Sequence, residues 1–560
     1  MSTLNIVTTM MAAPLSLNHF LERAGKLFPN SEVVSRLPNK GLKRHSFKQY
    51  YDRTLQLASA LKVLGLKKGD RVATLSWNHH AHLEAYFGIP AAGGVMHTLN
   101  LRLAPEEIAW IASNANDRFL IVDDVLLPLL DKVLPHLSEG HSFEEIIVFR
   151  FSDSELTPEH VQRGYLDYDQ LLSSSPAFEG FVPHDENDPV AMCYTSGTTG
   201  RPKGVVYSHR STVLHSLVGC MPDAWKLSGS DTVLPVTPMF HANSWGLPYA
   251  CMMLGTKLVF PGPHLHAHDL LDLMAQEPPT MAVGVPTIWL TLIQALEAEP
   301  NRWTLPVGMR SLVGGSATPE SLIRAFAKRG VELSQGWGMT ETSPLATVFY
   351  KKHELNGLDE QAWFKRKTLA GLPVPLVDLR IVGEGGDIAP WDGVAVGEVQ
   401  VRGPFVTGDY HKVTRDPEKF TADGWLRTGD VAAIDSYGYL RIADRTKDLI
   451  KSGGEWISSV DLENAIMGHP DVAEAAVIAL PHDKWGERPL ACLVLKPRAA
   501  QVSATPSPEL LERLTKLLKA QFLSWQLPEA YLLVDAIPRT STGKFWKAKL
   551  REIYPDWPKT

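Results

Sequence analysis

Apolar runs of two different periods alternate along most of the chain, and this alternation limits the possible folds more than any other feature of the sequence. Residues 47–66, FKQYYDRTLQLASALKVLGL, carry apolar side chains at helical spacing, and the short apolar run RVATLSW after them is typical of a buried strand. Strand-like runs return at FLIVDD, EEIIVF, KLVFPGP and TMAVGV. Such alternation predicts an α/β fold with a largely parallel sheet.

The predicted elements become smaller after about residue 440. Ser458 and Asp461 form an N-cap pattern, and the strand-like runs AEAAVIALP and ACLVLK follow. The segment ELLERLTKLLKAQFLSW predicts an amphipathic helix whose inward residues are Leu510, Leu511, Leu514, Leu517, Leu518 and Phe522. We therefore predict a large N-terminal α/β domain over residues 1–446 and a small α+β domain over residues 447–560.

Charge and cysteine content exclude several classes of protein. The 55 Lys and Arg residues against 62 Asp and Glu leave a net charge of -7, which argues against a dedicated nucleic-acid binder. Four scattered cysteines without a C-x-x-C indicate neither a disulfide framework nor a thiolate zinc site. No signal peptide and no apolar run of membrane-spanning length is visible. We expect a cytoplasmic protein, with peripheral membrane contact left open.

Residues 194–204, YTSGTTGRPKG, form a loop rich in glycine and hydroxyl groups straight after the apolar run PVAMCY. Backbone amides, hydroxyls and a lysine suit a phosphate group. The loop is not a Walker A motif, since Gly197 is followed five positions later by Pro202 and Lys203 is followed by Gly204. No G-x-G-x-x-G opens a helix after a strand, so the dinucleotide fingerprint also fails. Standing alone, such a loop can also be a surface turn.

Four segments further along the chain accompany this loop: GWGMTETSP at 336–344, GWLRTGD at 424–430, DRTKDLIKSGGEWIS at 444–458 and PRTSTGKFWK at 538–547. In order and spacing the five segments resemble those of the adenylate-forming superfamily of acyl-CoA synthetases, peptide-synthetase adenylation domains and luciferases. Within it, TPMFHANSWGLPYA, GVPTIWL, VGGSATP and KSGGEWISSVDLE are most similar to medium- to long-chain fatty acyl-CoA synthetases.

The resemblance implies ATP-dependent ligase chemistry in two steps. An acid attacks the α-phosphate of ATP, giving an acyl adenylate and pyrophosphate, and coenzyme A then displaces AMP. The catalytic residues implied are Lys544, Glu341, Thr340, His241 and Lys203, with Mg²⁺ held by Glu341 and Thr198. Those implied to bind ATP or AMP are Thr195, Ser196, Gly197, Thr198, Thr199, Gly200, Gly315, Ser316, Ala317, Gly336, Trp337, Gly338, Met339, Asp430 and Arg445.

The resemblance also implies a mobile C-terminal domain. Rotation about a hinge at Lys447 would exchange Lys544 for a coenzyme A surface formed by Gly453, Gly454, Glu455 and Trp456. Trp245 matches the position of an indole that gates the acyl tunnel in related long-chain enzymes. Trp337 departs from the family pattern, which usually has tyrosine there, although an indole can equally stack on adenine.

Other functions stay open at this point. The acid can instead be a short specialised one such as 3-methylthiopropionate, or the acyl group can be loaded onto another acceptor. A silent binding module would be expected to lack Lys544, Glu341 or Asp430, and all three are present. His79 and His82 share a predicted helical face, and His264 with Asp269 matches the H-x4-D pattern of some acyltransferases. The resemblance allows a homodimer.

Overall fold

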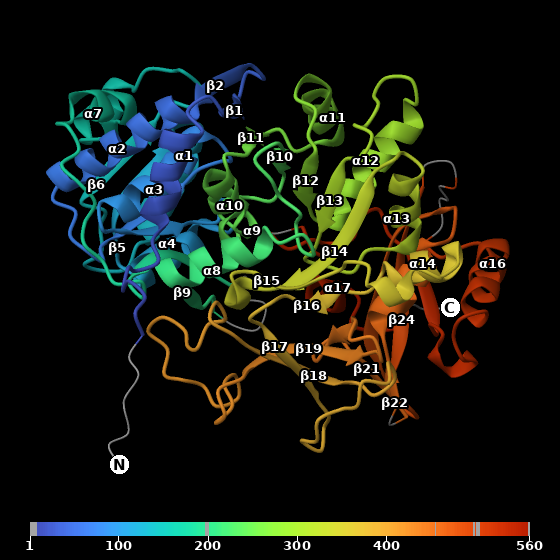
Figure 1. Cartoon of the computed structure of the whole chain (residues 1–560). Helices are drawn as coiled ribbons and strands as arrows, with labels where there is room; N and C mark the ends of the chain where they lie inside the picture. Colours follow the sequence, from blue (N-terminus) through green and yellow to red (C-terminus); the bar gives the residue numbers. More distant parts are fainter. Residues whose placement is uncertain are drawn as a thin grey trace, which may run out of the picture.

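The structure is a computed structural model, and it describes residues 8–195, 201–453, 455–496, 499, 504–541 and 543–557. The predictions for Ser196, Gly197, Thr198, Thr199, Gly200 and Gly454 therefore lie outside the described residues. Within the described ranges the strands form four sheets, and the chain runs from the blue lobe in Figure 1 to the red C-terminal region.

The first sheet has the strand order β7-β6-β5-β3-β4-β8-β9, and its neighbouring strands are parallel except for the β8–β9 pair. Its strands are β3 (Arg71–Leu75), β4 (Val95–Thr98), β5 (Asp117–Asp123), β6 (Glu145–Phe149), β7 (Leu166–Asp167), β8 (Pro189–Tyr194) and β9 (Gly204–Ser208).

The second sheet has the order β16-β15-β14-β13-β12-β10-β11-β1-β2, with parallel pairing from β14 through to β1. Its strands are β1 (Glu32–Arg36), β2 (Leu42–Ser46), β10 (Thr232–Pro235), β11 (Lys257–Phe260), β12 (Met281–Gly284), β13 (Arg310–Val313), β14 (Glu332–Gly338), β15 (Leu345–Val348) and β16 (Leu372–Pro373). The predicted α/β class with largely parallel sheets is confirmed.

Successive residues of a strand point to opposite faces of its sheet, so both faces of each sheet carry side chains that helices can cover. One group of helices lies between the two sheets, and another lies on their outer faces. Val33 belongs to the core shared by both sheets, whereas Val34 belongs to the core on the outer side. The helices between the sheets are α1 (Leu17–Leu27), α2 (Phe47–Val63), α3 (His80–Ala91), α8 (His209–Gly219) and α10 (Leu247–Leu254). The outer helices are α4 (Pro105–Ala115) and α5 (Leu127–Val133) on the first sheet, and α11 (Ala267–Gln276), α12 (Pro286–Ala298) and α13 (Glu320–Ala327) on the second. The shorter helices are α6 (Pro158–Gln162), α7 (Tyr168–Ser174), α9 (Ala242–Trp245) and α14 (Glu360–Arg366).

Two smaller sheets follow toward the C-terminus. An antiparallel sheet is formed by β17 (Asp378–Val382), β18 (Gly397–Arg402), β19 (Leu426–Ile434) and β20 (Leu440–Arg445). The last sheet contains β21 (Ile450–Ser452), β22 (Glu455–Ile457), β23 (Val472–His482), β24 (Gly486–Leu495) and β25 (Ala530–Leu533). The helices α15 (Ser459–Met467), α16 (Pro508–Lys519) and α17 (Lys547–Ile553) pack on it, as the predicted small α+β unit requires.

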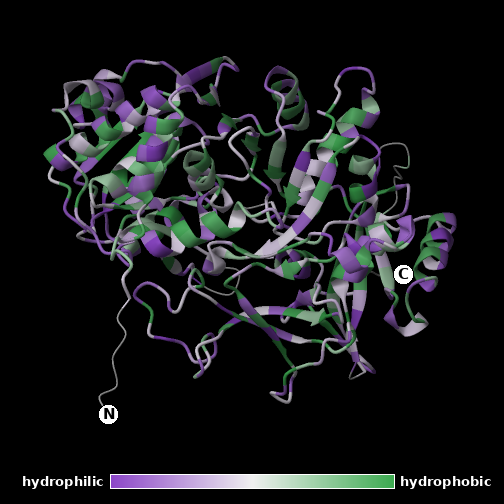
Figure 2. Cartoon of the chain, viewed as in Figure 1, coloured by the Kyte–Doolittle hydropathy of each residue, from purple (hydrophilic) through white to green (hydrophobic). Residues whose placement is uncertain are grey.

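The predicted cap and amphipathic helix of this unit are found, with two corrections. Of the residues predicted to face inward, Leu511 and Leu517 are only half-buried and are not part of the core. The Ser458 side chain accepts a hydrogen bond from the backbone N–H of Asp461 at 3.0 Å. Green and purple alternate along α16 in Figure 2, but the helix ends at Lys519, whereas the prediction extended it to residue 525. The chain turns there because two backbone N–H groups, of Gln521 and Phe522, bond to the carbonyl of Leu518. Phe522 still packs on the core from this turn.

Candidate active site

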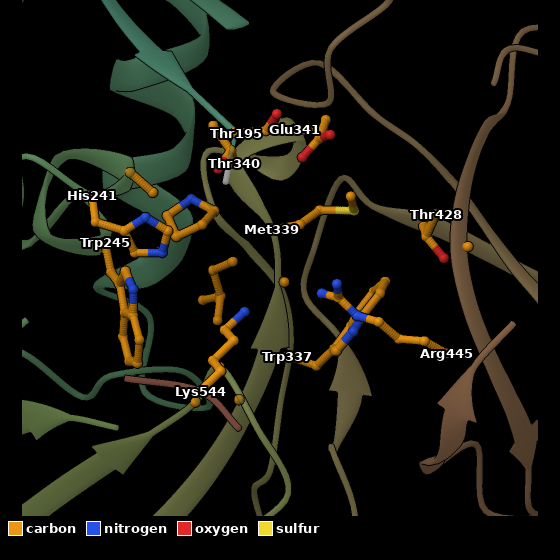
Figure 3. Close-up of a pocket in the computed structure, with 18 of the residues that line it drawn as sticks. Thr195, His241, Trp245, Trp337, Met339, Thr340, Glu341, Thr428, Arg445 and Lys544 are labelled. Carbon is orange, nitrogen blue, oxygen red and sulfur yellow. The ribbon is translucent and has the colours of Figure 1, made fainter. Parts of the chain in front are cut away.

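A cavity of about 400 Å³ opens where the parallel strands of both sheets end. Residues just after β8, β10, β12, β13 and β14 line it, which is the usual place for a ligand in α/β sheets. Two further residues, Lys447 and Lys544, come from the C-terminal domain. The predicted site residues that line this cavity are Thr195, Lys203, His241, Trp245, Gly315, Gly336, Trp337, Gly338, Met339, Thr340, Glu341, Arg445, Lys447 and Lys544 (Figure 3).

The two ends of the predicted phosphate loop are held together. The backbone N–H of Thr195 donates to the carbonyl of Lys203 at 3.0 Å, and the N–H of Lys203 donates to the Thr195 hydroxyl at 3.1 Å. The Lys203 ammonium lies 5.0 Å from the centre of the Tyr410 ring and 4.0 Å from the Asp416 carboxylate. A cation is thus fixed at the mouth of the loop, where it can attract phosphate charge.

A buried carboxylate contacts the same tyrosine. Glu341, in a short 3-10 turn after β14, accepts a hydrogen bond from the Tyr410 hydroxyl at 2.7 Å. The Tyr207 hydroxyl holds the same turn by donating to the carbonyl of Thr340 at 2.8 Å. Burial raises the pKa of Glu341, against the opposing effect of the Tyr410 hydrogen bond. A buried carboxylate with this environment fits a divalent cation, which would compensate its charge.

The side of the cavity lined by Trp337 and Arg445 contains an unexpected hydrogen bond. Nε1 of Trp337 donates to Oδ2 of Asp430 at 2.8 Å, and Nε of Arg445 lies 3.4 Å from Oδ1 of the same carboxylate. Asp430 and Arg445 face each other across β19 and β20, which are paired strands. Trp337, which stands where the family pattern usually has tyrosine, therefore supplies an indole N–H that holds the Asp430 carboxylate.

The C-terminal domain reaches the cavity through Lys544. Its loop is docked on the large domain by two hydrogen bonds, from Asn100 to the Ser541 hydroxyl at 3.0 Å and from Arg102 to the Ser541 carbonyl at 3.2 Å. A methyl group added at Gly315 would lie 3.2 Å from Cε of Lys544, so the glycine leaves room for the lysine. Burial and the Arg445 guanidinium lower the pKa of Lys544 to about 8.

His241 and Trp245 form the wall opposite Trp337 and Arg445, with Lys544 between the two groups (Figure 3). Burial, together with the charges of Lys544 and Arg102, lowers the pKa of His241 to about 3, so its imidazole is neutral at ordinary pH.

Trp245 ends a run of four residues, 242–245, whose φ angles lie between 43° and 58°. Left-handed backbone in non-glycine residues is strained and is found mainly at functional sites. The run sets the indole against Gly314, where an added methyl group would lie 3.1 Å from Cη2 of Trp245.

Several predicted residues are not part of this cavity. Ser316 is exposed and Ala317 is half-buried, and neither lines the cavity wall. Gly453, Glu455 and Trp456 lie in the β21–β22 hairpin, where the N–H of Gly453 donates to the carbonyl of Trp485 at 2.8 Å. In this arrangement Lys544 lines the cavity, whereas none of the described residues that were predicted to bind coenzyme A does.

The histidine clusters have other partners. His79 caps α3 and its Nε2 lies 2.9 Å from a carboxylate oxygen of Asp123, while Nε2 of His82 lies 3.0 Å from the Thr74 hydroxyl. Both histidines are buried and pack in the core. Nε2 of His264 lies 3.0 Å from the carbonyl of Leu37. Asp269 instead pairs with Lys40 at 2.6 Å, so the two do not form a hydrogen-bonded dyad.

Sequence reasoning missed Tyr410, Tyr207 and Trp225, which hold or line the site. Tyr410 is separated from Glu341 by 69 positions, and no local pattern connects them. Asn100 and Arg102 were missed for the same reason, since they bond to Ser541 across more than 400 positions of sequence. The described residues contain no cluster of His, Cys, Asp and Glu suited to holding a metal by itself.

Comparison with known proteins gives the class of enzyme to which this fold and cavity belong. The chain belongs to the AMP-binding enzyme family, whose model matches residues 21–411, and the C-terminal domain model of that family matches residues 461–544. The predicted superfamily and its two-domain α/β class are confirmed, and so is the predicted enzyme class, an AMP-forming acid–thiol ligase.

The chain is similar to a long-chain-fatty-acid–CoA ligase of Thermus thermophilus, at 49% identity over 98% of this chain and 97% of that protein. It is 40% identical to a 3-methylmercaptopropionyl-CoA ligase of Ruegeria pomeroyi, with 98% of each chain covered. Among solved structures, the anthranilate CoA ligase AuaEII with anthranoyl-AMP matches with a TM-score of 0.84 and 26% identity, covering 97% of this chain and 98% of that one.

Proposed function

We propose that this protein activates a medium- or long-chain fatty acid and transfers it to coenzyme A, giving acyl-CoA, AMP and pyrophosphate. The observation that carries the proposal is the position of Lys544, which enters the same cavity as His241 and as Trp337, whose indole N–H holds Asp430. An acid-binding wall, a nucleotide-binding wall and a cation between them are what adenylation needs. The relatives named as long- and medium-chain fatty acid ligases support the acid class.

In the first half-reaction an oxygen of the acid carboxylate attacks the α-phosphorus of ATP, and the bond to pyrophosphate breaks. The Lys544 ammonium would contact both the carboxylate and the α-phosphate, reducing their repulsion. Lys203 would hold the departing pyrophosphate, and Asp430 would accept hydrogen bonds from the ribose. Glu341 would bind Mg²⁺, which neutralises phosphate charge when present. Neutral His241 would flank the carboxylate without adding a second cation.

In the second half-reaction the thiolate of coenzyme A attacks the acyl carbonyl and AMP leaves. Lys544 occupies the cavity in the arrangement described here, whereas Gly453 and Trp456 lie elsewhere. We propose that the C-terminal domain, residues 447–560, rotates about Lys447 and presents the hairpin in place of Lys544. Lys447 itself lines the cavity at the junction of the two domains.

The second candidate acid is short and specialised, such as 3-methylthiopropionate, because two relatives at 40% identity are named as ligases for 3-methylmercaptopropionate. Pyrophosphate release, measured with straight-chain acids from two to 18 carbons and with this thioether acid, separates the two. Mass spectrometry of the products identifies the acceptor. The fatty-acid proposal expects highest activity with a medium or long chain, and highest activity with the thioether acid would overturn it.

No helix among the described residues is long and apolar enough to cross a membrane. We propose that the protein acts in the cytoplasm on small-molecule substrates and forms a homodimer, as its family resemblance allows. Sedimentation equilibrium measures the mass of the particle directly. A single species at the 61.9 kDa of one chain would contradict the dimer.

A further inference from the structure

Trp225 lines the same cavity as Lys544, although it lies outside every motif of the sequence. Its side chain is 3% exposed and belongs to one continuous apolar core with Leu312 and Leu345, which also line the cavity. Two of them are connected to the Trp245 side: a methyl group at Gly246, the residue after Trp245, would lie 2.8 Å from the His215 ring, which contacts Trp225 and accepts a hydrogen bond from the N–H of Leu345. The acid's hydrocarbon chain needs such a surface, whereas the phosphates and ribose need the polar groups of the opposite side.

The apolar wall of the cavity extends along strand β13. At its start, Arg310 donates a hydrogen bond to the carbonyl of Trp225 at 3.0 Å. Just past its end, Gly315 lies against Lys544. The five steps along the chain from Arg310 to Gly315 span about 16 Å in an extended strand. The apolar wall therefore runs along β13 from Lys544, where the carboxylate is expected, toward Trp225.

The indole of Trp225 is fixed in its place. Its backbone N–H donates to the carbonyl of Gly219 at 2.9 Å, where α8 ends. A methyl group at Gly219 would lie only 2.4 Å from Cζ3 of Trp225, so the ring rests directly on the glycine. The His215 ring stands edge-on at 5.6 Å between ring centres, and its Nε2 accepts a hydrogen bond from the N–H of Leu345.

We infer that Trp225 closes the acyl end of the cavity and limits the acid to medium length. The inference rests on the proposed function and adds a residue that determines its specificity. A cavity of about 400 Å³ must hold both adenylate and acid, so a large side chain at the far end leaves little length for the acid. Gly219 and His215 pack against the ring, so little space remains for it to move aside.

The test is the Trp225→Leu variant, assayed for kcat/KM of pyrophosphate release with straight-chain acids of increasing length. A shorter side chain opens the end of the pocket. Two acids are compared: the one that the wild type prefers and one that is two carbons longer. In the variant, kcat/KM for the longer acid relative to kcat/KM for the preferred acid should rise by about ten-fold or more. Butyrate, which is too short to reach Trp225, should keep its wild-type kcat/KM.

Trp225→Phe is the matched control, because phenylalanine keeps a ring on Gly219 and fills most of the same space. Its length preference should stay close to that of the wild type. Trp225→Met is the second opening variant if Trp225→Leu does not fold, and the same shift is expected from it. An equal loss for acids of every length, or an unchanged optimum in a folded opening variant, would overturn the inference.

A measurement on the wild-type protein does not depend on the variants. Affinity for straight-chain acids, measured with a non-reactive ATP analogue and without coenzyme A, should increase with each added methylene and then fall once the chain meets Trp225. An increase that continues through 18 carbons would overturn the inference. Absence of pyrophosphate release with every acid would instead contradict the proposed function, so the two failures are distinguishable.

Discussion

Nε1 of Trp337 donates a hydrogen bond to the Asp430 carboxylate at 2.8 Å, across 93 positions of sequence. The same carboxylate lies 3.4 Å from Nε of Arg445, so one of its oxygens faces the indole and the other the guanidinium. A carboxylate held from two sides is pre-oriented before any nucleotide arrives. Tyrosine at this position would offer a hydroxyl at the far end of its ring, whereas tryptophan offers an N–H on its edge.

Trp337→Phe should weaken ATP binding, because phenylalanine keeps an aromatic face for adenine but loses the N–H that orients Asp430. Hydrogen bonds to charged groups contribute roughly 1.5–3 kcal/mol, so we expect KM for ATP to rise by about ten-fold or more with a smaller change in kcat. Steady-state pyrophosphate release checks this. With 2′-deoxy-ATP, the KM values of the variant and the wild type should differ less than they do with ATP. Equal KM values for ATP in the two proteins would contradict the proposed role of the Trp337 N–H.

Lys544→Ala should abolish adenylation yet spare thioester formation. The ammonium enters the cavity in the arrangement suited to the first step, and the second step is proposed to use another surface of the same domain. We expect pyrophosphate release to fall by about two to three orders of magnitude. Acyl-CoA formation from a supplied acyl adenylate should stay near the wild-type rate. Lys549→Ala, at a half-exposed lysine paired with Glu552, is the control, and equal losses in both half-reactions would refute the division of labour.

The first half-reaction should weaken as the solution becomes basic. Burial and Arg445 lower the pKa of Lys544 to about 8, so the ammonium loses its proton as pH rises through that value. Because kcat/KM reports groups of the free enzyme, its pH profile should fall above about pH 8. Arginine keeps its charge at this pH, so the residual activity of Lys544→Arg should lack this fall. If kcat/KM of the Lys544→Arg variant falls in the same way above about pH 8, a group other than Lys544 causes the fall.

Glu341→Gln should lower pyrophosphate release by about two to three orders of magnitude and raise the Mg²⁺ concentration needed, because the amide carries no charge for the cation. Tyr410→Phe removes the hydrogen bond that orients Glu341, and a loss of about ten-fold is expected from it. Mg²⁺ titration of both variants checks that Glu341→Gln lowers activity more than Tyr410→Phe does. Glu354→Gln, at an exposed glutamate, is the control. A Mg²⁺ requirement unchanged in Glu341→Gln would sink the assignment.

Lys447→Pro should slow thioester formation more than adenylation. Proline fixes φ near one value, and the proposed rotation requires the backbone at this position to change conformation. Lys447→Ala removes the same side chain while leaving the backbone free, so it isolates the conformational effect. Single-turnover measurements with acid and ATP, and then with a supplied acyl adenylate, separate the two steps. Equal slowing of both steps by proline would place the hinge elsewhere.

The segments that carry the site could be predicted because their chemistry is local. Thr195, Glu341, Asp430 and Lys544 each stand in a short motif whose residue types suit phosphate, cation or ribose, and all but Asp430 line the cavity directly. Asp430 is reached through Trp337 instead. Tyr410 could not be predicted, because a single tyrosine among 14 gives no sign that its hydroxyl meets a glutamate far along the chain.

The sequence by itself determined the alternation of helices and strands, the small C-terminal unit and the class of chemistry, since periodicity and short motifs depend on neighbours along the chain. Only the tertiary structure decided that Lys544 reaches the cavity while the described coenzyme A residues do not, that Trp337 holds Asp430, and that Trp225 lines the same cavity as Lys544. Those relationships depend on how segments hundreds of residues apart pack, and close packing fixes side-chain positions that no local pattern encodes.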